Sequence, residues 1–211
     1  MNNKHFQKQK GLSLVEVLVS FAIFGLLSVS LMSIFTATVN TQTVVLQHQA
    51  IMNEANFAID YMGRAIRLAR ADNSTSGSGA CTGTIDTNYS DTTSSFTEIK
   101  FLSYDPMANG GVGAYCCRKF ALNTTNHTIY EYKSSTMLAS DFPATGTAIT
   151  SSQVIVNNLT FVAQNRALSD YKQPMVTISL DMVPNGRRIV PIPEIRVQTS
   201  LSQRNLNISS D

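Results

Sequence analysis

One long apolar run near the N-terminus constrains what this 211-residue chain can fold into. Residues 14–35 read LVEVLVSFAIFGLLSVSLMSIF, and Glu16 is the only formally charged residue among them. A helix of about 20 apolar residues crosses a hydrocarbon core of about 30 Å, and this run reaches that length. Three lysines precede it without an acidic neighbour: Lys4, Lys8 and Lys10. We therefore predict a membrane-spanning helix with a cytoplasmic N-terminus.

Three interpretations of this segment compete. A secretory signal peptide has an apolar stretch of about 7–15 residues followed by an Ala-x-Ala-like cleavage site. Here the stretch is longer and no such site follows it. A plain signal anchor fits the length but leaves Glu16 unexplained, because a charged side chain in a membrane segment costs about 2.5–3.5 kcal/mol on insertion scales. The third interpretation gives Glu16 a partner.

Residues 10–16 read Lys-Gly-Leu-Ser-Leu-Val-Glu. Together with the basic leader and the apolar run, this stretch resembles the prepilin processing motif of type IV pilins and type II secretion pseudopilins. The resemblance implies that a prepilin peptidase cleaves after Gly11 and that the new N-terminus at Leu12 is N-methylated. It also implies a role for Glu16 in subunit assembly. Leu12 stands where the family usually has Phe, so an apolar residue is kept.

Cleavage after Gly11 would give Leu12 a positive amine. In a filament, a neighbouring subunit would offer that amine to Glu16. A buried carboxylate either pairs with a cation or becomes neutral, so this pair would fix the axial register of one subunit against the next. The alternative is that Glu16 lies at the level of the lipid headgroups, as in an ordinary anchor.

No helix breaker follows the apolar run for a long distance. The first proline is Pro106, and residues 12–72 contain only two glycines, so one long helix is predicted. From Ile51 onward, apolar residues recur every three or four positions, which is typical of an amphipathic helix. Residues 36–49, polar but uncharged and rich in Thr and Gln, join the two halves.

The C-terminal part has the composition of loops and strands. Residues 74–97 contain many Ser and Thr residues, which indicates a loop. Six segments with strand character follow: Thr97–Ser103, Tyr115–Leu122, Thr128–Lys133, Val154–Ala163, Met175–Val183 and Ile195–Ser202. Their alternation with period two predicts antiparallel strands with one face on a core. The predicted fold class is α+β, with the long N-terminal helix packed on a C-terminal antiparallel β-sheet.

We expect four regions along the chain. They are a cleaved basic leader at 1–11, a transmembrane or filament-core helix at 12–35, its amphipathic continuation at 36–72 and an extracytoplasmic antiparallel β domain at 73–211. The end of the chain also resembles the larger minor subunits, namely the J-type pseudopilin and the W-type minor pilin. That resemblance rests on Leu159–Phe161, Pro174–Leu180 and Gln198–Asn205.

The chain has three cysteines: Cys81, Cys116 and Cys117. An extracytoplasmic location permits a disulfide. Adjacent strand residues point to opposite faces, so Cys81 should suit only one of the vicinal pair, and the odd count leaves open which one. No metal site is expected, because histidine occurs three times, C-x-x-C is missing, and the residues from Asp86 onward lack the Gly and Glu of a calcium loop.

No catalytic motif is visible, so we expect a protein that is not an enzyme and needs no cofactor. The predicted function is that of a minor pilin or pseudopilin, which primes or joins a membrane-anchored type IV pilus or type II secretion pseudopilus. A membrane-anchored adhesin or binding module displayed by a pilus, and a signal-anchored envelope enzyme, are the alternatives.

The expected partners follow from this function. They are the prepilin peptidase, other minor and major pilins or pseudopilins, the inner-membrane assembly platform and membrane lipid. The net charge of +2 does not favour nucleic acid, which is expected as a partner only in DNA uptake. The predicted location is the inner membrane, with a single span, the N-terminus inside and the C-terminal domain outside, extending to a filament tip or the cell surface.

Overall fold

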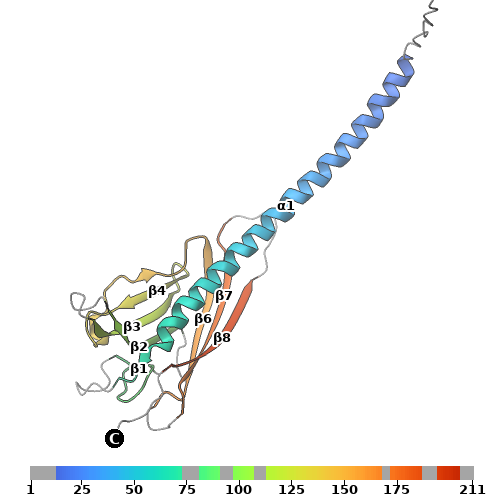
Figure 1. Cartoon of the computed structure of the whole chain (residues 1–211). Coiled ribbons are helices and arrows are strands. Elements are labelled where there is room, and N and C mark those ends of the chain that lie inside the picture. Colours follow the sequence, from blue (N-terminus) through green and yellow to red (C-terminus); the bar gives the residue numbers. More distant parts are fainter. Residues whose placement is uncertain are drawn as a thin grey trace, which may run out of the picture. The chain divides into compact units, whose positions relative to one another are not determined.

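The computed structural model describes residues 13–72, 81–90, 97–106, 113–167, 172–186 and 194–204. The chain divides into two compact units, residues 1–46 and 47–211. One helix, α1 (Leu14–Arg67), runs through the described residues of the first unit and forms the opening segment of the second (Figure 1).

The helix α1 ends at Arg67 rather than at the predicted residue 72. Its last turn tightens, because the N–H of Leu68 donates to the carbonyl of Ala65 at 3.2 Å. The backbone of Ala69 and Arg70 then pairs with a strand instead of continuing the helix. Tertiary pairing therefore overrides the helical pattern of the sequence at this point.

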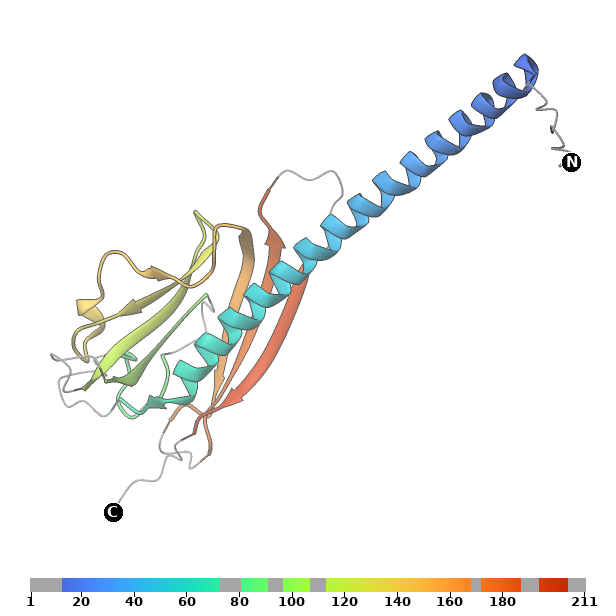
Figure 2. The ribbon, with the colours of Figure 1, turned by 45° about the horizontal axis from the view of Figure 1, so that its top comes forward.

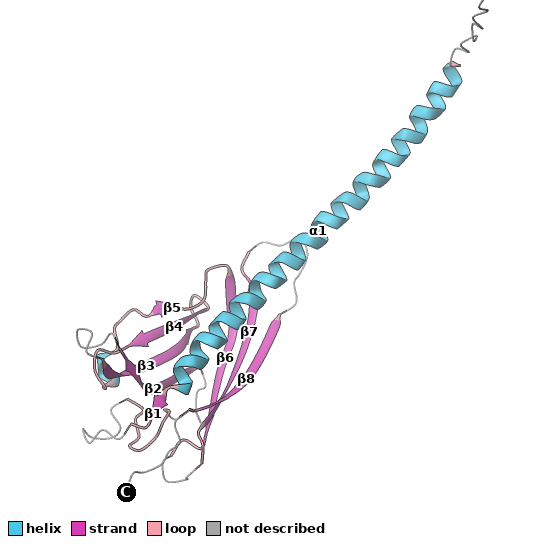
Figure 3. Ribbon diagram, in the orientation of Figure 1, coloured by secondary structure: helices cyan, strands magenta, loops and turns pink. Residues whose placement is uncertain are grey.

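The strands form two antiparallel sheets (Figure 3). The first sheet has the order β1 (Ala69–Arg70), β2 (Glu98–Asp105), β3 (Ala114–Asn123), β4 (Thr128–Lys133) and β5 (Thr147–Ala148). The second has the order β6 (Val154–Gln164), β7 (Met175–Pro184) and β8 (Ile195–Ser202), and a short 3-10 helix, η1 (Ala139–Asp141), precedes β5. The α+β class is confirmed, and every predicted strand is present. The single predicted sheet is replaced by two.

The second part of α1 packs on both sheets (Figure 2). The ring of Tyr61 meets that of Phe120 on β3 edge to face, with 6.3 Å between centroids. On the other side, a Cβ added to Gly63 would lie 3.0 Å from Leu201 Cδ1 on β8. Glycine at this position lets the helix approach the second sheet closely.

The core lies between α1 and the two sheets. The helix buries a stripe of mostly small or unbranched residues: Ile51, Ala55, Ala58, Met62, Gly63, Ala65 and Ile66. The sheets cover this stripe with fully buried side chains such as Phe101, Phe120 and Phe161. Burial of each large apolar side chain stabilises the fold by about 1.5–3 kcal/mol. The amphipathic pattern predicted from Ile51 onward therefore corresponds to the core-facing side of α1.

Tyr89 closes the core at the end of α1. Its side chain is fully buried, and its hydroxyl donates a hydrogen bond to the carbonyl of Ile66 at 3.0 Å. The ring packs edge to face on Phe101. The last carbonyls of a helix have no partner within the helix, so Tyr89 satisfies one of them in a place that water does not reach.

We expect Tyr89→Phe to lower the free energy of unfolding by about 0.5–1.5 kcal/mol at neutral pH, because one hydrogen bond is lost. Burial also raises the pKa of Tyr89 above its usual value of 10.0. The unfolded chain therefore ionises Tyr89 first, and the wild type loses stability as the pH rises above about 10. Denaturant unfolding of the full chain in detergent at pH 7 and pH 11 measures both effects.

The exposed Tyr104 supplies the control for this prediction. Tyr104→Phe should leave stability unchanged at neutral pH. The Tyr89→Phe variant should lose less stability at pH 11 than the wild type does. An equal alkaline loss in both proteins would contradict the assignment to Tyr89.

Candidate processing and assembly site

The start of α1 is shaped by Ser13 and Glu16. The carbonyl of Ser13 accepts the N–H groups of Glu16 at 3.0 Å and Val17 at 3.2 Å, which begins the helix. Glu16 thus lies in the first turn, where a negative charge interacts favourably with the helix dipole. The predicted cleavage residues Gly11 and Leu12 lie outside the described residues.

The first part of α1 exposes its apolar side chains on all sides. Leu14 and Phe21 are each 76% exposed, and the most apolar window of this helix has no part buried in the chain. By length and composition, α1 can cross a membrane. Among the described residues no cation forms an ion pair with Glu16, which is exposed in the isolated chain. A lipid or protein environment must therefore cover this surface.

Serine hydroxyls within the apolar run are satisfied by the helix itself. Ser20 donates to the carbonyl of Glu16 at 2.7 Å, Ser28 to Phe24 at 2.8 Å and Ser30 to Leu26 at 3.0 Å. A hydroxyl without a hydrogen bond is costly in an apolar environment. These bonds to the preceding turn lower that cost, so the serines are compatible with burial of the helix.

A buried carboxylate joins the second part of α1 to the first sheet. Glu131 on β4 is only 4% exposed, and its Oε2 accepts a hydrogen bond from the Tyr61 hydroxyl at 2.7 Å. The guanidinium of Arg118 on β3 forms an ion pair with Oε1 of the same carboxylate. Burial, followed by this hydrogen bond, raises the pKa of Tyr61, so its hydroxyl stays protonated and donates at neutral pH.

This cluster was missed by the sequence analysis. Its signal is Glu131, a charged residue on the same strand face as Ile129, where the alternation predicts an apolar side chain. A buried charge must be paired, but the pattern alone does not reveal that its partners come from α1 and β3. Loss of Arg118 would leave only the half-exposed Lys133, whose Nζ lies 3.8 Å from Oε2, to compensate the buried carboxylate.

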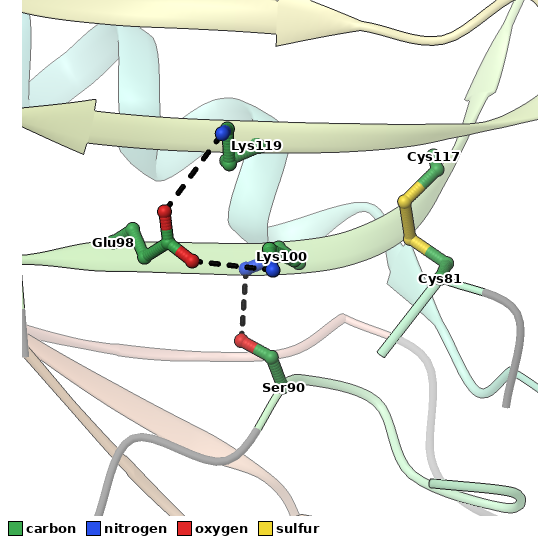
Figure 4. A network of polar contacts seen from close by, with 6 residues as sticks. All are labelled: Cys81, Ser90, Glu98, Lys100, Cys117 and Lys119. Carbon is green, nitrogen blue, oxygen red and sulfur yellow. Dashed lines mark hydrogen bonds and ion pairs between the residues drawn. A yellow bond between two sulfur atoms is a disulfide. The ribbon is translucent and has the colours of Figure 1, made fainter. Parts of the chain in front are cut away.

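The structure pairs Cys81 with Cys117 in a disulfide, at a sequence separation of 36 (Figure 4). Leu102 packs with the two sulfur atoms on one face of the first sheet. Cys116 points to the opposite face and is a buried free thiol. Burial, together with the nearby Asp105, raises the pKa of Cys116, which keeps it in the unreactive thiol form.

The polar groups beside the disulfide neutralise one another. The carboxylate of Glu98 lies 3.2 Å from Lys100 Nζ and 3.8 Å from Lys119 Nζ. Figure 4 draws both contacts as dashed lines. Ser90 Oγ accepts the backbone N–H of Lys100 at 3.0 Å. The Lys119 ammonium also lies 4.3 Å from the centre of the Tyr132 ring. These lysines therefore stabilise the sheet surface and its adjoining loop.

Within the described residues, no group of three His, Cys, Asp or Glu side chains could hold a metal ion. The predicted processing and assembly residues lie at, or just before, the start of α1. That segment combines a carboxylate in the first helical turn with an uncovered apolar surface, and three lysines precede it in the sequence.

Residues 6–32 match the family model described as the prokaryotic N-terminal methylation motif. No curated protein and no solved structure matches the chain. The match includes Gly11, Leu12 and Glu16, and it extends through the apolar start of α1. Together with a long helix packed on antiparallel sheets, it defines a pilin-like class of protein. The chain carries this prepilin-type methylation motif, and over these residues it is similar to type IV pilins and pseudopilins.

We expect the double variant Cys81→Ser/Cys117→Ser to lose about 3–4 kcal/mol of stability, because the disulfide closes a long loop. The measurement is denaturant unfolding of the full chain in detergent, with and without a reductant. The control is Cys116→Ala, which keeps the disulfide and should remain sensitive to the reductant. Reductant sensitivity of the double variant would contradict the pairing.

Proposed function

We propose that this chain is a minor pilin or pseudopilin, which primes or joins a membrane-anchored type IV pilus or type II secretion pseudopilus. The observation that carries this proposal is the methylation motif at residues 6–32, which runs directly into an uncovered apolar helix. A plain anchor needs the helix alone. The motif adds a cleavage site and a carboxylate at a fixed distance from it.

The roles proposed for individual residues follow from this function. A prepilin peptidase cleaves between Gly11 and Leu12, and the new amine on Leu12 is methylated. Before assembly, the apolar part of α1 lies in lipid with the basic leader on the cytoplasmic side. The domain formed by residues 47–211 then lies outside the cytoplasm, where the Cys81–Cys117 disulfide is stable.

In the filament, apolar helices of neighbouring subunits replace the lipid around α1. The Leu12 amine of one subunit then pairs with Glu16 of another. In the low dielectric of a helix bundle, this pair is favourable only at one axial position, because any other register leaves both charges unpaired. The pair therefore sets the register between subunits, while the apolar side chains supply most of the attraction.

The proposed processing predicts the mass of the mature chain. Intact-mass spectrometry should show a protein that begins at Leu12, with or without one methyl group. Gly11→Val should yield an uncleaved, membrane-inserted precursor, because a side chain there blocks the close approach of the peptidase to the backbone.

Gly25→Val is the matched control, because Gly25 lies beyond the cleavage site and has open space around it. This variant should be processed normally. Normal processing of Gly11→Val, or a wild-type protein that still begins at Met1 in cells with an active prepilin peptidase, would contradict the proposal.

We expect Glu16→Ala to insert into the membrane and to be processed, yet to join filaments poorly. Loss of one member of a desolvated ion pair costs about 3–5 kcal/mol, although apolar packing retains part of the attraction. The measurement is crosslinking of the variant to neighbouring pilins in intact cells at equal membrane levels.

Asp60→Ala is the control for this experiment, because Asp60 is an exposed carboxylate of the same helix that pairs with Arg64. It should crosslink like the wild type. If Glu16→Ala also crosslinks like the wild type, Glu16 has no role in assembly.

A further inference from the structure

The outer edge of β8 is open. The strand Ile195–Ser202 pairs with β7 along its whole length, from Ile195 opposite Met182 to Ser202 opposite Met175. It is the last strand of its sheet (Figure 3). Elsewhere in the described chain, no backbone group pairs with β8. One row of its N–H and C=O groups therefore faces away from the sheet, and no strand among the described residues pairs with it.

The other sheet edges in the described part of the chain are short or closed. The strands β1 and β5, which border the first sheet, have two residues each. The outer edge of β6 faces the first sheet, where the N–H of Val156 donates to the carbonyl of His127 at 2.9 Å. The edge of β8, by contrast, has eight residues.

The sequence of β8 lacks the features that normally prevent another strand from pairing with an edge strand. It contains neither Pro nor Lys, and its register with β7 is continuous, without a bulge. Its one charged residue, Arg196, is already paired, because its Nε lies 2.8 Å from Oδ1 of Asp181 on the neighbouring strand. Asp181 therefore balances the charge of Arg196, and this edge carries no net charge that would repel another strand.

The side chains along β8 also leave room for a neighbour. Gln198 and Ser200 are exposed, and Val197 and Thr199, which alternate with them, are only half-buried. In the same alternation, Ile195 and Leu201 at the two ends are buried. A strand laid along this edge would pair the free backbone groups and cover Val197 and Thr199 in the middle.

We propose that β8 accepts an extended strand from a neighbouring pilin-family subunit, which extends the three-stranded sheet across the subunit boundary. This inference rests on the proposed function, because the filament holds the domains side by side at high effective concentration. Backbone hydrogen bonds supply the affinity in this mode of recognition, and alternate side chains supply the specificity. The added strand should place small or apolar residues beside Val197 and neutral polar residues beside Gln198.

We propose a segment other than β8 of a second copy as the added strand. Antiparallel pairing of two β8 strands about a twofold axis would turn the second parts of the two α1 helices in opposite directions. Subunits anchored in one membrane point the same way, so this dimer is incompatible with the proposed location.

The test uses photocrosslinking of the full chain in cells that make filaments. One protein carries p-benzoylphenylalanine in place of Phe21, which reports on assembly of the apolar helix. A second carries it in place of Gln198, which reports on the edge of β8. Mass spectrometry of the crosslinked peptides identifies the segments touched. We expect Phe21 to crosslink to pilin helices and Gln198 to a strand of a pilin-family subunit.

Two substitutions then test the mode of contact. Val197→Lys places a charge on the inward side of the edge, a known protection against strand addition, and should reduce the crosslink at Gln198 about tenfold. The matched change on the outward side, Ser200→Lys, should reduce it much less. Equal effects of the two lysines would overturn strand addition in favour of a general surface contact.

The remaining outcomes separate the two proposals. If Phe21 crosslinks to pilins but Gln198 crosslinks to nothing, or only to a second β8, strand addition is overturned and the assembly function stands. If Phe21 fails to crosslink to any pilin, the proposed function is overturned, and the inference about β8 falls with it.

Discussion

The close packing of α1 on both sheets is the interaction on which the domain depends. One side of α1 is apolar and faces the core, and this side has to pack against two sheets at once. Ala55 and Ala58 add little bulk, and Gly63 lets the helix reach Leu201 on β8. Larger residues at these positions would hold the helix away from the sheets and open voids beneath it. The two sheets then share one core, although few backbone hydrogen bonds connect them.

The same helix meets two different environments along its length, and its sequence changes accordingly. Up to residue 35 it is apolar on every side, whereas from Ile51 it is apolar only toward the core. Two carboxylates of the chain differ in their surroundings in the same way. Glu131 has Arg118 and Tyr61 within its own chain. Glu16 has no such cation in the described part of its own chain.

Features encoded by neighbouring residues could be predicted from the sequence, and features that depend on distant residues could not. The bounds of β4 and β8 agree with the predicted strands because period-two alternation is local. The division into two sheets depends on which strands pair, and alternation carries no information about partners. The same holds for the choice of Cys117 over Cys116, which depends on which face of β3 turns toward Cys81. The methylation motif is contiguous, so it was readable from the sequence, although Gly11 and Leu12 lie outside the described residues.

The first part of α1 and the edge of β8 are both uncovered in the isolated chain, and they need different surroundings. The first part of α1 exposes apolar side chains, which lipid covers and water does not. The edge of β8 exposes backbone N–H and C=O groups, which form hydrogen bonds with water but not with lipid tails. As a membrane precursor, the chain can therefore be stable with α1 in the bilayer and β8 in water. In the proposed filament, neighbouring helices would replace the lipid around α1. The proposed strand addition would let those same neighbours replace water at β8, which couples loss of the membrane environment to contact between the domains.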